Sequence, residues 1–284
     1  MNLLKTCIFT ALGCAASWSM ASTINSVPSC YAANKLPMAA PAPEREVFIL
    51  LDQTTPLDAS LQKSVMDNAG RLIQPGTAYS IATFSSFGQG RYLELLSAGT
   101  LEVPLPEATR SSVGVKVLRS LDACLTGQQN YVRKAAATAL QQAMAGISAD
   151  YAKSDVMASV KEMSARIKQS PAPSKILFLV SDMLENSGVS SFYANRNVRS
   201  LNANTELQKA ASAGMLADLA GARVFVLGAG LVQDANSKGF AKDSGIYRDP
   251  KTMAALKDFW SQYFQRSDAK LQEFGMPALL VPVQ

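Results

Sequence analysis

Residues 46–58 have the sequence EVFILLDQTTPLD, and the rest of the predicted fold is arranged around them. Val47–Leu51 is an unbroken run of apolar, β-favouring residues. A run without polar alternation is typical of a strand that is buried on both faces, as in a parallel sheet covered by helices. The run ends at a carboxylate, Asp52, and the hydroxyl of Thr54 follows two positions later.

The same order of residues recurs at 175–186, which have the sequence KILFLVSDMLEN. An apolar strand ends there at Ser181 and Asp182, and Glu185 follows. Open α/β sheets bind ligands outside the carboxyl ends of their strands, where the strand order reverses. Two buried strands that are each followed by an acidic residue at that edge therefore predict a cation site lined by oxygen atoms.

The remaining patterns predict an α/β domain with a doubly wound, mostly parallel central sheet, one antiparallel edge strand and helices on both faces. The antiparallel pair is expected at 77–87 and 91–98, because only Gly88–Gly90 separates these two strands. Residues 104–129 give no clear pattern. Apolar spacing predicts helices at 59–74, 131–145, 155–169, 206–220 and 249–271, with further strands at 223–227 and 278–283.

The chain contains no histidine among its 284 residues. This excludes catalytic triads, general bases and metal ligands built on histidine, and with them most hydrolase and zinc-enzyme classes. A metal in this protein therefore has to be held mainly by oxygen. The net charge of +5 is spread without a block of Lys and Arg, so nucleic-acid binding is not indicated.

The amino terminus has the features of an export signal, which predicts a periplasmic or secreted protein. Lys5 precedes a short apolar region at 6–18, and Ser19–Ala21 forms a small-x-small cleavage site. The apolar region is too short to span a membrane comfortably. Lipid attachment at Cys14 is the alternative to cleavage after Ala21. The predicted division is a signal peptide at 1–21, an extended lead-in at 22–43, and one domain at 44–284.

Cleavage after residue 21 removes Cys7 and Cys14 and leaves Cys30 and Cys124. Two cysteines in an oxidising compartment predict a single disulfide. Such a bond joins the lead-in to the middle of the domain. Two unpaired thiols are the alternative.

The two acidic turns resemble those of the von Willebrand factor A domain, and the resemblance covers residues 44–283. In that family the first strand ends in Asp-x-Ser-x-Ser, and a later strand ends in Asp. Asp52 matches the first aspartate, Thr54 the first hydroxyl and Asp182 the later aspartate. Pro56 stands at the second hydroxyl position and cannot coordinate through its side chain.

The resemblance implies a metal-ion-dependent adhesion site, which in the family also takes a hydroxyl from an intervening loop. Ser154 is the candidate for that hydroxyl, and Glu185 is expected to act through a water or to cap the following turn. Carboxylate and hydroxyl oxygens are ligands that Mg²⁺ prefers. The alternatives are that Asp52 satisfies turn amides and that Ser154 is a helix cap. The candidate metal ligands are Asp52, Thr54, Ser154, Asp182 and Glu185.

The resemblance also implies a function without catalytic turnover. The chain is expected to bind another protein in the cell envelope, whose acidic side chain completes the coordination of the cation. A metal-free structural component of the envelope is one alternative. A phosphohydrolase similar to the haloacid dehalogenases is another, although Thr54 stands where that family has a second aspartate.

Overall fold

The computed structural model describes residues 27–86, 93–148, 153–194, 197–231 and 249–284. The predicted signal peptide and the expected turn at Gly88–Gly90 therefore lie outside the described residues. Within the described ranges, no helix combines the length and the apolar composition that a membrane span requires.

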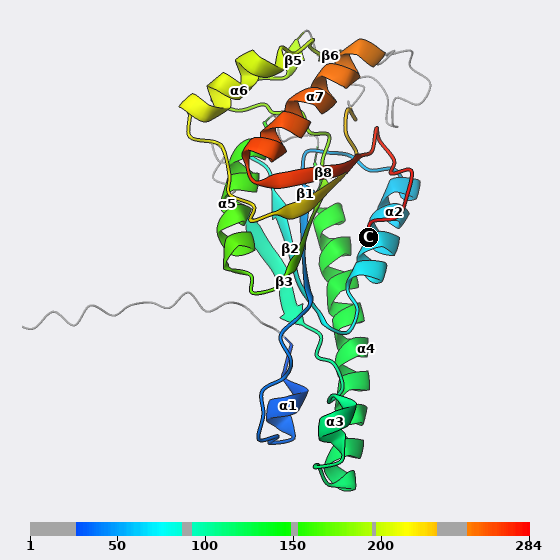
Figure 1. The fold of residues 1–284 in the computed structure, drawn as a ribbon. Helices are drawn as coiled ribbons and strands as arrows, with labels where there is room; N and C mark the ends of the chain where they lie inside the picture. Colours follow the sequence, from blue (N-terminus) through cyan, green and yellow to red (C-terminus); the bar gives the residue numbers. More distant parts are fainter. Residues whose placement is uncertain (1–26, 87–92, 149–152, 195–196, 232–248) are drawn as a thin grey trace, which may run out of the picture.

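A six-stranded sheet with helices on both faces forms the centre of the molecule (Figure 1). The strand order is β3-β2-β1-β4-β7-β8, and all neighbours pair in parallel except β3, which runs antiparallel to β2 at one edge. This confirms the predicted fold class. The strands are β1 (Arg45–Asp52), β2 (Thr77–Phe84), β3 (Glu94–Thr100), β4 (Ser174–Val180), β7 (Ala222–Leu227) and β8 (Ala269–Phe274).

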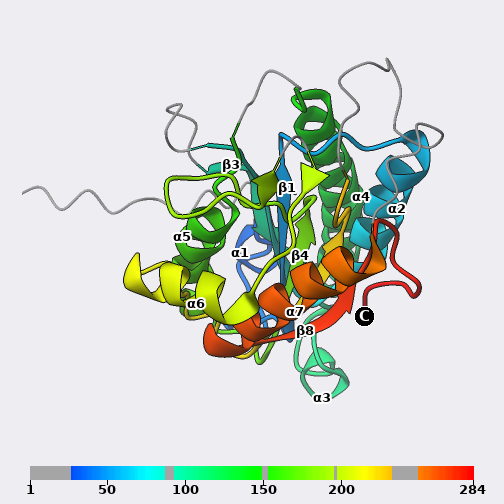
Figure 2. The same cartoon turned by 90° about the horizontal axis from the view of Figure 1, so that it is seen from above.

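Alternate residues of β1 point into two separate apolar clusters, one on each face of the sheet. Val47, Ile49 and Leu51 pack with helices α2 (Ala59–Leu72) and α4 (Val115–Ala145). Phe48 and Leu50 pack on the other face, which α5 (Val156–Gln169), α6 (Ala203–Ser212) and α7 (Pro250–Arg266) cover (Figure 2). Burial on both faces is why this strand has no polar alternation.

The sheet order reverses between β1 and β4, which is the position where open α/β sheets form their ligand sites. Leu51 is in register with Val180, so the next residues, Asp52 and Ser181, meet at the same edge. The prediction that the two acidic turns follow neighbouring parallel strands is therefore confirmed.

Helix α4 is much longer than predicted. It has 31 residues and begins at Val115, so it includes more than half of the stretch at 104–129 that gave no pattern. Its first half, with α3 (Glu107–Arg110), extends beyond the sheet (Figure 1). This half has few buried apolar residues because it packs on a small cluster formed with the amino-terminal segment and residues 105–113, and helical periodicity in the sequence is correspondingly weak.

The end of the chain also differs from the prediction. Helix α7 stops at Arg266, and a turn at Asp268 with φ of +52° leads into β8. The strand predicted at 278–283 is wrong, since these residues are irregular. The last strand alternates between exposed and more buried residues, which suits an edge strand with one covered face. Helix α6 likewise ends early, at Ser212.

The predicted disulfide between Cys30 and Cys124 is confirmed and links residues 94 positions apart. It attaches the short helix α1 (Cys30–Ala33) to α4. Tyr31 and Leu121 are buried beside the bond, and the Glu102 carboxylate accepts hydrogen bonds from the Ser29 hydroxyl and the Cys30 amide at 2.6 and 2.7 Å. The segment predicted as an extended lead-in thus contains a helix with its own apolar contacts.

Replacing both Cys30 and Cys124 with Ser should lower the free energy of unfolding by about 4–5 kcal/mol, because the bond restricts the unfolded chain over a long loop. Urea denaturation of a chain that starts at Ser22 measures the change. Reduced wild-type protein should match the double variant. Two titratable thiols in the native, unreduced protein would contradict the disulfide.

Candidate metal centre

Asp52, the last residue of β1, is 1% exposed, and its carboxylate accepts four hydrogen bonds. Oδ1 accepts from the backbone N–H and the hydroxyl of Thr54, at 2.9 and 2.7 Å. Oδ2 accepts from the hydroxyls of Ser154 and Ser181, both at 2.9 Å. Burial raises the pKa of Asp52, and these hydrogen bonds oppose that rise by stabilising the ionised form.

Three separate segments supply the hydroxyls around Asp52. Thr54 lies in the turn after β1, where the aspartate side chain accepts from the amide two residues on, as turn aspartates commonly do. Ser154 precedes α5, and its carbonyl accepts a hydrogen bond of 2.9 Å from the Asn186 amide. Ser181 follows β4 in register with Asp52. The structure therefore brings together Asp52, Thr54 and Ser154, three of the candidate ligands.

Asp182 is 4% exposed and joins the same cluster. Its backbone N–H donates to the Thr55 hydroxyl at 2.9 Å, which connects the turns after β1 and β4. Its Oδ1 accepts from the Leu184 amide at 2.8 Å, and its Oδ2 accepts from the Tyr193 hydroxyl at 3.0 Å. The pKa of Asp182 is raised well above its ordinary value, mainly by burial and to a smaller extent by the negative charge of Asp52.

Neither carboxylate has an ion-pair partner among the residues that the structure describes. Two buried carboxylates near each other are unfavourable without a compensating charge, because burial removes their hydration. A hard cation would supply that charge. Over the described ranges no group of three or more His, Cys, Asp and Glu side chains could hold a metal. Hydroxyl oxygens would therefore have to complete the ligand set, and the residues present fit that requirement.

Glu185 has a different position from the other candidate ligands. It is buried, and its carboxyl accepts a hydrogen bond of 2.9 Å from the Met157 amide in the first turn of α5. Burial raises its pKa to about 8. The contact satisfies one of the amides that lack a partner at the start of a helix. Glu185 thus caps the start of α5, and its hydrogen bond with the Ser187 side chain also ties it to its own turn, as one of the two expectations had it.

Sequence analysis missed the roles of Ser181 and Tyr193. Ser181 supplies a second hydroxyl to Asp52 Oδ2, in addition to that of Ser154. The register of two adjacent parallel strands ending in polar residues could have indicated it. Tyr193 lies 11 residues beyond Asp182, at the start of a two-residue strand, and no local pattern indicates its contact.

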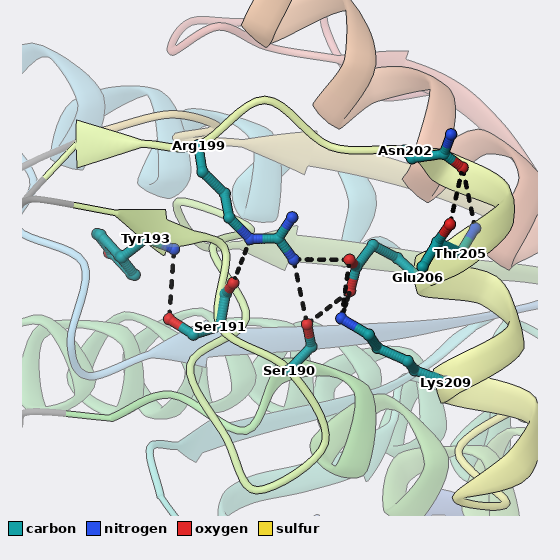
Figure 3. A network of polar contacts seen from close by, with 8 residues as sticks. All are labelled: Ser190, Ser191, Tyr193, Arg199, Asn202, Thr205, Glu206 and Lys209. Carbon is teal, nitrogen blue, oxygen red and sulfur yellow. Dashed lines mark hydrogen bonds and ion pairs between the residues drawn. The ribbon is translucent and has the colours of Figure 1, made fainter.

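A polar network holds the segment that carries Tyr193 (Figure 3). Its centre is Glu206 of α6, which is 3% exposed and accepts from Arg199 at 2.7 Å and from Lys209 at 3.1 Å. The Ser190 hydroxyl also donates to Glu206. Tyr193 itself begins β5 (Tyr193–Ala194), which pairs with β6 (Asn197–Val198).

The chain matches no protein-family model and no curated protein. Its fold is similar to that of an aerotolerance-related membrane protein from Bacteroides fragilis, with 11% identity, a TM-score of 0.35, and coverage of 81% of this chain and 92% of that one. BatB from Bacteroides thetaiotaomicron shows 12% identity, a TM-score of 0.36, and coverage of 81% and 90%. The PilB minor pilin from Streptococcus sanguinis shows 10% identity, a TM-score of 0.44, and coverage of 84% and 58%. At these identities and TM-scores the function has to be inferred from the chain's own residues.

Replacing Glu185 with Gln should flatten the pH dependence of stability. The pKa of Glu185 is raised from 4.5 to about 8 in the folded protein, so its protonated form favours folding. That contribution is fully present below the unfolded pKa and is lost as the pH rises through about 8. Glutamine retains an oxygen for the Met157 amide and does not titrate.

Urea denaturation at about pH 5 and about pH 9 compares the two proteins across this window. Wild type should lose stability relative to Glu185→Gln as the pH rises. The variant Glu107→Gln, at an exposed position, is the control and should follow wild type. Parallel pH profiles for wild type and Glu185→Gln would contradict the effect of burial.

Proposed function

We propose that the chain is an exported, von Willebrand factor A-like module that binds another protein through a divalent cation at the carboxyl edge of its sheet. One observation carries the proposal. Three hydroxyls converge on the buried Asp52 carboxylate, beside a second buried carboxylate, at the point where the strand order reverses.

The hydrogen bonds support separate roles for the site residues. Thr54 and Ser154 donate their hydroxyl protons to Asp52, so the lone pairs of their oxygens can face a cation. The Ser181 hydroxyl also accepts from the Met183 amide at 2.9 Å and has one lone pair fewer to offer. Asp52 would therefore orient the hydroxyls, and the Asp182 carboxylate would supply the main charge.

Such a site suits Mg²⁺, which binds oxygen ligands in an octahedron and keeps several of its waters. The protein groups named above leave coordination positions for water. An acidic side chain of a partner protein can replace one of these waters, which makes binding depend on the cation. We propose no catalytic turnover, because the residue two positions after Asp52 is Thr54 and not a second acid.

Export is supported by the leader-like sequence at 1–21 together with the disulfide, since such bonds persist in oxidising compartments. A metal-free structural role in the envelope is the second candidate. It is favoured by one observation, namely that the four hydrogen bonds to Asp52 satisfy this carboxylate without an ion.

Trp260 offers a direct probe of cation binding. Its Nε1 donates to the carbonyl of Met183, the residue after Asp182, at 2.8 Å. It is the single tryptophan in residues 22–284, because the other one, Trp18, lies in the predicted leader. After chelation, adding Mg²⁺ or Mn²⁺ to a chain that starts at Ser22 should change the Trp260 fluorescence in a saturable way.

Asp182→Asn should have opposite effects on stability in the absence and in the presence of the cation. Without cation, the variant should be at least as stable as wild type, because it removes the repulsion between two buried carboxylates. With cation at about a hundredfold excess over Kd, wild type should gain about 2.7 kcal/mol, which the variant should lose. Thermal melts with and without the cation measure both effects.

Asp218→Asn provides the matched control, since Asp218 forms an exposed ion pair with Lys168 and should leave the cation response intact. Equal melting temperatures of wild type with and without divalent ions would instead favour the metal-free structural role.

A further inference from the structure

We propose that Tyr193 gates the candidate metal centre: its hydroxyl holds Asp182 in the cation-free protein and has to leave that oxygen when the cation binds. This inference rests on the proposed function and adds a regulating contact to it. Tyr193 would thus be an internal competitor of the cation and set the threshold concentration at which the site is filled.

The geometry distinguishes the two oxygens of Asp182. Oδ1 accepts from the Leu184 amide at 2.8 Å, a backbone donor that the turn itself holds in place. Oδ2 accepts from the Tyr193 hydroxyl at 3.0 Å, a side-chain donor that a rotation can withdraw. Asp182 is nearly fully buried, whereas Tyr193 is only partly buried. Oδ2 is therefore the oxygen that a cation can reach by displacing one side chain.

The backbone on the amino-terminal side of Tyr193 is fixed. Phe192 is buried in an aromatic cluster, with its ring centre 5.0 Å from that of Phe259 in an edge-on arrangement. The Phe192 amide donates to the Glu185 carbonyl at 2.8 Å, and its carbonyl accepts from the Arg199 amide at 2.9 Å.

The Arg199 side chain adds a second attachment. Its Nε donates to the Ser191 carbonyl at 2.6 Å, while its guanidinium is paired with Glu206 (Figure 3). With the backbone held in this way, the gate opens by rotation of the Tyr193 side chain and not by unfolding of the segment. Opening then costs one hydrogen bond to a carboxylate and little chain entropy.

Removing the hydroxyl should make the cation bind more tightly. Hydrogen bonds to an ionised group are stronger than those between neutral groups. Because this bond stabilises the cation-free state, Tyr193→Phe should lower the Kd for Mn²⁺ about tenfold. The phenylalanine ring retains the size and apolar character of the tyrosine ring.

The experiment titrates Mn²⁺ into chelated wild type and Tyr193→Phe, with Trp260 fluorescence and calorimetry as readouts. Tyr131→Phe is the control, because Tyr131 is 49% exposed on α4 and its hydroxyl should not affect the Kd. Circular dichroism of the chelated proteins checks that Tyr193→Phe has folded.

Tighter binding by Tyr193→Phe than by wild type, or binding by the variant alone, would support the gate. Equal or weaker binding by the variant, with wild type also binding, would overturn the gate and leave the proposed function in place. Absence of binding in both proteins would overturn the gate and the cation-dependent function together.

Discussion

The burial of one carboxylate, that of Asp52, is the constraint on which the arrangement of this protein depends. A carboxylate with 1% exposure loses its hydration and has to recover equivalent interactions within the protein. It does so through donors from the turn after β1, from the start of α5 and from the end of β4. Three segments that are far apart in the sequence are thus fixed relative to one another at the sheet edge where a ligand is expected.

The central strands could be predicted from the sequence because burial on both faces leaves an unbroken apolar run. The strand β8 could not, since Leu271 continues the helical spacing of α7, and only the turn at Asp268 separates the two elements. The first half of α4 was missed for a related reason. It packs on the disulfide-linked segment rather than on the sheet, and a small contact surface requires few apolar residues.

The site residues also differ in how they could be found: some are evident from the local sequence, and others only from the tertiary fold. Asp52, Thr54 and Asp182 could be identified because each follows directly from a strand end. Ser181 required the strand register, which brings its hydroxyl into hydrogen-bond contact with the Asp52 carboxylate. Tyr193 required the tertiary fold, because the aromatic packing of the residue before it brings its hydroxyl to Asp182.

Anomalous scattering from crystals grown with Mn²⁺ would reveal directly whether a cation binds beside Asp182. We expect one anomalous peak near Asp182 Oδ2 and the hydroxyls of Thr54 and Ser154, at oxygen distances of about 2.0–2.3 Å for a small divalent ion. The absence of a peak there, with Tyr193 still bonded to Asp182, would argue against a cation at this edge.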